Sequence, residues 1–285
     1  MLRVFPFLLA LAALAGCSQA PDPARPAFWH VTGPHGEQGW LLGTIHALPR
    51  AANWRSPVIG QALGQANVVA VEVANLDDAA AMAAVFDRRE HSPGLPPLSA
   101  RVDPALRGAL ARQLALAQMK EADFADTESW AAALRLAHAG AAASDSANGI
   151  DRAVLRLARG KQVIELEGAD VQLGLFDAMP EAQQRALLAA VLRDAGRADD
   201  GKLADAWRKG DFAAIEAETH RGMLADPALR ETLFTGRNKA WADQLASRLD
   251  AGERVFVAVG AAHMAGADGL VAMLEARGFK VARVQ

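Results

Sequence analysis

The feature that most constrains the fold is a short apolar run, residues 255–259, which ends in Gly260-Ala261-Ala262-His263. Such a run of β-branched and aromatic residues is typical of a strand buried on both faces of a parallel sheet. The pattern also occurs earlier, where residues 40–42 lead into Gly43-Thr44-Ile45-His46. Because ligands of open α/β sheets bind beyond the carboxyl ends of the strands, we expect both imidazoles to project into one crevice.

Residues 28–285 are predicted to form one α/β domain, in which helices flank a central, mostly parallel or mixed sheet. A helix over 152–159, with Asp151 as its N-cap, leads directly into a strand, which indicates a right-handed parallel crossover. A last helix is expected over 266–277. The predicted strands cover residues 28–32, 39–44, 67–73, 161–167, 255–259 and 280–284.

Two long stretches carry helical rather than strand patterns. Residues from about 77 to 147 are rich in Ala and Leu at helical spacing, and they predict a helical insertion between the first and second sets of strands. Residues 170–231 are also mostly helical by pattern. Trp207 and Trp241 are expected to anchor the core.

The N-terminus resembles an export signal. Residues 1–16 combine one early arginine with an apolar run too short to span a bilayer, followed by Cys17, the only cysteine. The segment ending in Cys17 looks like the lipobox of bacterial lipoproteins, which predicts lipid attachment at Cys17. The alternative is simple cleavage after Ala20. Residues 17–27 are polar and proline-rich, which predicts a flexible tether. We therefore expect a protein anchored by its lipid to a membrane of the bacterial envelope and facing the periplasm.

The predicted strand ends carry four polar side chains, those of His46, Glu72, Glu167 and His263. Two imidazoles with one or two carboxylates suit a first-row divalent metal and leave positions open for water. The alternative is structural: the histidines bind backbone groups, and the two glutamates form salt bridges with Arg237 or another arginine. A net charge of −3 gives no reason to expect nucleic acid as a partner.

The ordered set of short motifs resembles the TraB/PrgY/GumN family, to which the animal Tiki proteases are related. The resemblance spans about residues 28–285. It rests on Gly43-Thr44-Ile45-His46, Val71-Glu72, Gly149-Ile150-Asp151, Leu166-Glu167 with Gln172, Gly236-Arg237-Asn238, and Gly260-Ala261-Ala262-His263 with Gly266. It implies a fold like that of the erythromycin esterase and ChaN group, and a divalent-metal-dependent hydrolase, with manganese or cobalt favoured in the Tiki branch.

The sequence and the resemblance together lead us to expect metal-dependent hydrolysis of a peptide bond in a peptide or protein substrate. His46 and His263 would bind manganese, cobalt or zinc, and Glu72 would be a further ligand or the base. Glu167 and Asp151 are candidates for ligands or for groups that support the ligands. Arg237 would stabilise an oxyanion or hold a substrate carboxylate, and Asn238 matches a further motif position. The alternative is a lipoprotein that binds haem, metal or peptide without catalysis.

Overall fold

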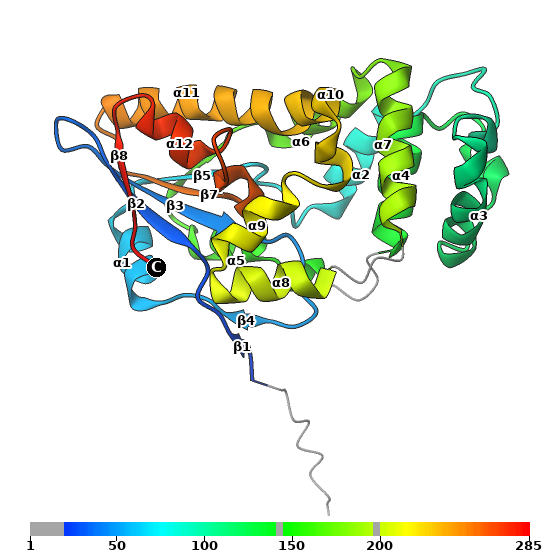
Figure 1. Ribbon diagram of the computed structural model, residues 1–285. Coiled ribbons are helices and arrows are strands. Elements are labelled where there is room, and N and C mark those ends of the chain that lie inside the picture. Colours follow the sequence, from blue (N-terminus) through cyan, green and yellow to red (C-terminus); the bar gives the residue numbers. More distant parts are fainter. Residues whose placement is uncertain (1–19, 141–144, 196–199) are drawn as a thin grey trace, which may run out of the picture.

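The computed structural model describes residues 20–140, 145–195 and 200–285, so the predicted signal segment and Cys17 lie outside the described residues (Figure 1). Its central sheet has the strand order β6-β5-β7-β3-β2-β8. The first four of these strands run parallel, and β2 is antiparallel to both β3 and β8. The predicted α/β fold with a mixed sheet is confirmed. The strands are β2 (Phe28–Thr32), β3 (Gln38–Thr44), β5 (Val68–Val71), β6 (Gln162–Glu165), β7 (Val255–Gly260) and β8 (Lys280–Arg283).

Both faces of the sheet are covered by helices, which explains the unbroken apolar runs of its inner strands. All six residues of β7 are buried. Phe256 packs toward one face with Trp207, while Val257 packs toward the other with Trp241, so both predicted tryptophan anchors are confirmed. In Figure 1 the first face lies below the sheet and the second above it. The helices below are α1 (Pro57–Gln65), α5 (Ile150–Leu157), α8 (Asp200–Lys209) and α9 (Phe212–Glu218); those above are α11 (Gly236–Asp250) and α12 (Leu270–Glu275).

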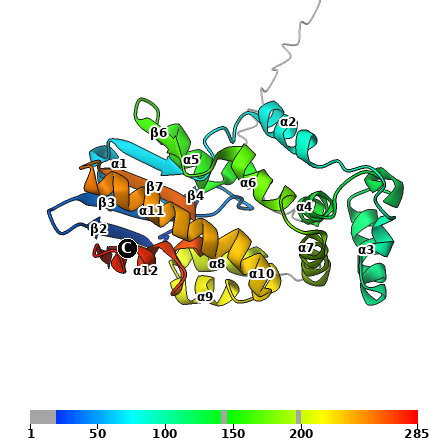
Figure 2. The same cartoon turned by 90° about the horizontal axis from the view of Figure 1, so that it is seen from above.

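The predicted insertion is helical, and it shares a third hydrophobic core with helices that come later in the chain. Trp130 and Leu136 pack there with Leu187, Leu188 and Leu229. Figure 2 shows this helical layer beside the sheet rather than over it. Its helices are α2 (Ala79–Arg89), α3 (Arg107–Leu116), α4 (Ser129–Gly140), α6 (Gly168–Asp177), α7 (Glu181–Asp194) and α10 (Pro227–Arg230).

Short helical turns connect the longer elements. A π-helical turn, η6 (Glu231–Thr235), runs directly into α11. The 3-10 turns are η1 (Leu98–Ala100), η2 (Pro104–Leu106), η3 (Glu121–Phe124), η4 (Ser146–Asn148), η5 (Gly222–Ala225) and η7 (Ala261–Met264). No helix among the described residues has the length and apolar character needed to cross a membrane.

The predicted tether and the predicted last helix both differ from the structure. From Asp22 onward the predicted tether is packed on the domain, because β1 (Asp22–Pro23) pairs in parallel with β4 (Ala52–Asn53) and the Asp22 carboxylate forms an ion pair with Arg50. The last helix is also shorter than predicted. Gly266 has a φ of +74°, outside helical geometry, and the helix starts only after Gly269.

Candidate active site

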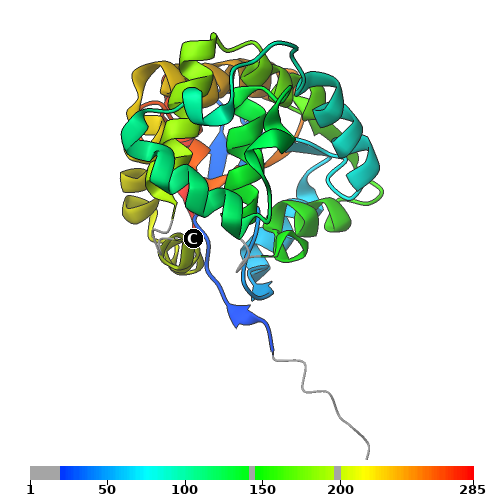
Figure 3. The ribbon, with the colours of Figure 1, turned by 90° about the vertical axis from the view of Figure 1, so that its right-hand side faces the viewer.

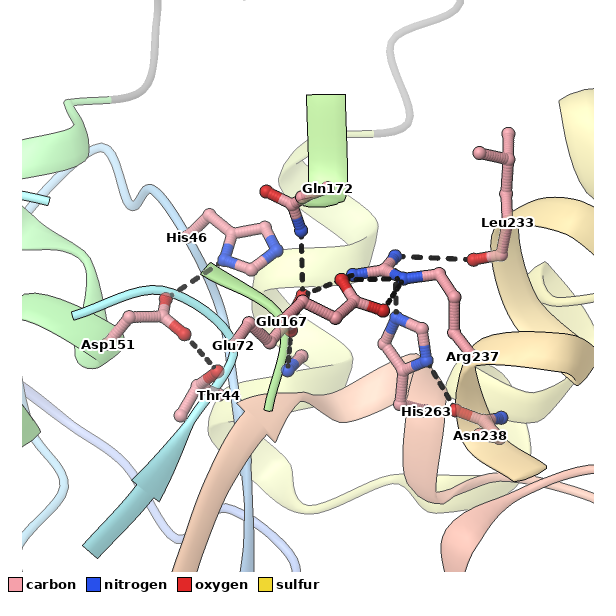
Figure 4. A network of polar contacts seen from close by, with 11 residues as sticks. Thr44, His46, Glu72, Asp151, Glu167, Gln172, Leu233, Arg237, Asn238 and His263 are labelled. Carbon is pink, nitrogen blue, oxygen red and sulfur yellow. Dashed lines mark hydrogen bonds and ion pairs between the residues drawn. The ribbon is translucent and has the colours of Figure 1, made fainter. Parts of the chain in front are cut away.

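The four strand-end residues meet at the carboxyl edge of the parallel strands (Figure 4). Glu72 follows β5 directly, His46 follows β3 by two residues, Glu167 follows β6 by two, and His263 lies in η7 just after β7. The backbone aligns the two glutamates, because the Glu72 carbonyl accepts hydrogen bonds from the Glu167 and Gly168 amides. Seen from the right-hand side of Figure 1, the strands lie within a ring of helices (Figure 3).

His46 is held by a buried carboxylate. Its Nδ1 donates to Asp151 Oδ2 at 3.0 Å, and Thr44 Oγ1 donates to Asp151 Oδ1 at 2.5 Å. The Asp151 charge raises the pKa of His46 above its usual value, although the imidazole itself is 70% exposed. Because Nδ1 carries the proton in this hydrogen bond, Nε2 is the atom left for other partners.

The prediction that Asp151 caps α5 is wrong. Gly149 is the N-cap, and Asp151 lies within the first turn, where its side chain is taken up by His46 and Thr44. Gly149 lets the start of α5 approach the His46 backbone, because a Cβ at position 149 would lie only 2.3 Å from the His46 carbonyl oxygen. The Ile150 amide donates to the Ile45 carbonyl at 2.9 Å, which fixes the start of α5 against the end of β3.

His263 is buried and held by an amide side chain. Its Nδ1 lies 2.6 Å from Asn238 Oδ1, and Asn238 Nδ2 donates to the Asp268 carbonyl at 2.7 Å. An amide oxygen can only accept, so Nδ1 carries the proton and Nε2 presents a lone pair. Burial, together with the charges of Arg237 and His46, outweighs the attraction of Glu72 and lowers the pKa of His263 to about 4. This imidazole is neutral at pH 7.

Aromatic rings complete the setting of His263. Its ring stacks on Phe234 at a centroid distance of 5.3 Å and packs against Trp241 at 4.6 Å. Trp241 also lies under the Arg237 guanidinium, 4.7 Å from ring centroid to Cζ. The tryptophan that we expected as a core anchor therefore also fixes two polar groups of the site.

Arg237 lies between the two glutamates. Its Nε and Nη2 bind Glu167 Oε1 and Oε2, each at 2.8 Å, and Nη2 also donates to Glu72 Oε2 at 2.9 Å. The three side chains are only 7–10% exposed. Nη1 donates to the Leu233 carbonyl at 3.3 Å and lies 3.5 Å from His263 Nε2. The salt bridges considered as the alternative are thus present, whereas the histidines bind side chains rather than backbone.

Glu72 has a partner on each carboxylate oxygen. Oε1 accepts from the Gly260 amide at 2.8 Å, while Oε2 accepts from Arg237 and from Gln172 Nε2 at 3.2 Å. Burial alone would raise the pKa of this carboxyl, but the neighbouring His263, His46 and Arg237 and the Gly260 amide lower it to about 2. Glu72 is therefore ionised at neutral pH.

The missing side chain of Gly260 leaves a space that three of these groups face. A Cβ built on Gly260 would lie 3.4 Å from Glu72 Oε1, 3.5 Å from His46 Nε2 and 3.7 Å from His263 Cδ2. In the part of the chain that the structure describes, no group of three or more His, Cys, Asp or Glu side chains is already close enough to hold a metal. The chemistry of these residues nevertheless fits a divalent ion, since two imidazoles with occupied Nδ1 atoms and one carboxylate are common ligands; the Nε2 atom of His263 is bonded to the Cδ2 atom that borders the space.

Glu167 has a different setting from the other three strand-end residues. Both of its oxygens bind Arg237, whereas Glu72 Oε1 accepts from the Gly260 amide and borders the space at Gly260. Its role as a metal ligand stays a prediction, and the observed contacts place it as the group that orients Arg237. Asp151 and Asn238 orient the two histidines in the same manner.

Three cavities open around the site. One of about 220 Å³ is lined by His46, Glu72 and Gln172, and a second of about 290 Å³ by His46, Trp207 and His263. The third, about 570 Å³, is lined by Arg237, His263 and Phe234. The site residues therefore form the shared walls of these cavities, and a ligand can reach them from more than one side.

Sequence reasoning missed the roles of several groups. Thr44 lies inside the first Gly-x-x-His motif, so its position was noticed, but its contact with Asp151 was not. Phe234 carried no signal that distinguishes it from an ordinary core residue. The Leu233 carbonyl that accepts from Arg237 lies within the π-helical turn η6, which the sequence pattern does not indicate.

Comparison with known protein families identifies the family of the chain. A sequence model described as the TraB/PrgY/gumN family matches residues 27–283. No curated protein and no solved structure matches the chain. The likeness to erythromycin esterase and ChaN therefore stays a prediction.

Proposed function

Because the chain belongs to the TraB/PrgY/gumN family and holds two imidazoles and a carboxylate around one space, we propose that it is a divalent-metal-dependent hydrolase of peptide bonds. The observation that carries this proposal is the space at Gly260, which Glu72, His46 and His263 all face. The choice of a peptide bond rests on the resemblance of the motifs to those of the Tiki branch.

In this proposal His46 Nε2, His263 Nε2 and Glu72 would hold manganese, cobalt or zinc. Such an ion supplies a Lewis acid that activates water and polarises a carbonyl group. Three protein ligands leave coordination positions open, as in other catalytic sites.

The remaining residues position these groups. Asp151 and Asn238 each accept the Nδ1 proton of one histidine and so direct its Nε2 into the site. Arg237 binds Glu72 and, after His263 and His46, helps to keep it ionised, while Glu167 in turn orients Arg237. One hydrogen of the Arg237 guanidinium, on Nη1, faces His263 and binds no carboxylate or carbonyl. This N–H group is therefore the candidate for contact with a developing negative charge.

We also propose that the protein works at the bacterial cell envelope, facing the periplasm and anchored through a lipid on Cys17. The support is the apolar run before Cys17 and the position of this single cysteine at the end of a lipobox-like segment. A peptide or a protein of that compartment would be the substrate.

The test combines metal content and activity. The purified protein is loaded in turn with manganese, cobalt and zinc, its metal content is measured by elemental analysis, and cleavage of an unstructured peptide pool is followed by mass spectrometry. We expect stoichiometric metal and cleavage in the wild type, with both lost in His46→Ala and His263→Ala. Tight binding of metal or haem without cleavage under any of these ions would instead favour the non-catalytic binding lipoprotein.

A further inference from the structure

Two of the three cavities adjoin each other at His263. The cavities of about 290 and 570 Å³ share part of their lining, including His263 itself. We call this the apolar groove and define it by Leu203, Trp207, Ile215, Leu224, Phe176 and Phe234. Because His263 lies in its wall, a group bound in the groove lies next to the proposed site of hydrolysis.

The edge of the apolar groove exposes hydrophobic side chains that do not contribute to the core. Leu203 on α8 is 40% exposed and Met223 on η5 is 36% exposed, although most large apolar side chains among the described residues are buried. Exposed apolar side chains that gather around a cavity mark a ligand site better than single ones scattered over the surface.

We propose that the apolar groove binds a large hydrophobic side chain of the peptide substrate, such as leucine, methionine or phenylalanine, beside the bond that is cleaved. This specificity rests on the proposed peptidase function. The cavity volumes suit this occupant, because a pocket of a few hundred Å³ encloses a side chain and part of its backbone.

The polar groups of the groove favour a peptide over a lipid chain. Glu218 lines both cavities, and its carboxylate binds Arg221 at 3.0 Å. A charged pair at this position offers hydrogen-bonding partners to the amide groups on either side of a bound side chain. A hydrocarbon tail carries no amide groups that could use these hydrogen-bonding partners.

The decisive experiment measures preference and binding separately. A set of peptides that differ at one position, with Phe, Leu, Gly or Asp there, is offered to the metal-loaded protein, and kcat/KM is measured for each. We expect the Phe and Leu peptides to be preferred by about 10-fold or more over Gly. Binding of the same peptides to the metal-free protein is measured by calorimetry.

Variants then locate the effect. Leu203→Asp and Met223→Asp change exposed residues, so the fold is expected to remain, and each should reduce the preference for Phe over Gly by about 10-fold. Leu116→Asp on α3 is the matched control, because Leu116 is 69% exposed and lines neither cavity; it should leave the preference unchanged.

The two proposals fail in distinguishable ways. The groove proposal is overturned if peptides are cleaved without a preference for apolar residues, or if Leu203→Asp does not change that preference. The hydrolase proposal would stand in both cases. If no peptide is cleaved, the hydrolase proposal is wrong, and the groove is then tested by the calorimetric binding measurement alone. Apolar peptides that bind the wild type but not Leu203→Asp would support the groove. Binding of fatty-acid micelles in preference to these peptides overturns it.

Discussion

His46 Nδ1 lies 3.0 Å from a carboxylate oxygen of Asp151, a residue 105 positions later in the chain. This contact joins the end of β3 to the first turn of α5, and it decides which imidazole nitrogen faces the site. A neutral amide in place of the carboxylate would test what the charge contributes, because the shape of the side chain stays the same.

We predict that Asp151→Asn weakens metal affinity and activity by about 10–100-fold while the fold is kept, as for other groups that support metal ligands. Removing the negative charge should also lower the pKa of His46 toward its usual value, since Asp151 is the main cause of the increase. NMR titration of the metal-free protein measures that pKa, and metal titration measures the affinity. An unchanged pKa in the variant would contradict the assigned role of Asp151.

A second prediction concerns the space at Gly260. Gly260→Ala places a methyl group 3.4–3.7 Å from Glu72, His46 and His263, where it takes the volume that an ion needs. The backbone tolerates the change, because φ at Gly260 is −47°. We expect metal binding and activity to be lost with little change in the melting temperature.

The control for this variant is Gly64→Ala in α1, where an added Cβ meets nothing within 4 Å. That substitution should leave activity unchanged and stabilise the helix by about 0.5–1 kcal/mol. If Gly260→Ala retains full metal affinity, the ion does not bind at this space.

A third prediction follows from the burial of Arg237 between two carboxylates. Arg237→Met leaves Glu72 and Glu167 without their cation, and removing one partner of a buried ion pair costs about 3–5 kcal/mol. Chemical denaturation measures this loss. Adding Glu167→Gln to the variant removes one of the uncompensated charges and should recover part of the stability; simple additivity of the two substitutions would argue against their coupling.

These residues also show how far the sequence alone could lead. Strand ends are predictable from apolar runs, and parallel strands place their carboxyl ends together, so the sequence predicts that His46, Glu72, Glu167 and His263 lie at one edge of the sheet. Asp151 was misassigned because a cap is a local pattern, whereas its real partner lies in β3. The central place of Arg237 depends on a π-helical turn and on Trp241 beneath it, and both depend on tertiary packing.

The N-terminus gives a fourth prediction. If Cys17 carries the lipid, Cys17→Ser should turn a membrane-associated protein into a soluble or unprocessed one. Fractionation of cells and mass spectrometry of the mature N-terminus measure this. A mature chain that begins at Pro21 would contradict the lipid anchor and favour simple cleavage.

The last prediction uses the lowered pKa of Glu72. Its folded-state pKa of about 2 lies below the ordinary value of 4.5. The ionised carboxylate therefore stabilises the folded protein above about pH 4.5, and this stabilisation is lost as the pH falls from 4.5 to 2. Glu72→Gln removes the titrating group, so the free energy of unfolding should depend less steeply on pH in this range. Denaturation at several pH values compares the variant with the wild type. Equal slopes would mean that Glu72 is not held as an ion by His263, His46, Arg237 and the Gly260 amide. At neutral pH the same variant separates the two roles of Glu72: weaker metal affinity identifies a ligand, whereas full metal content with turnover reduced by about 10²–10⁴ identifies the base.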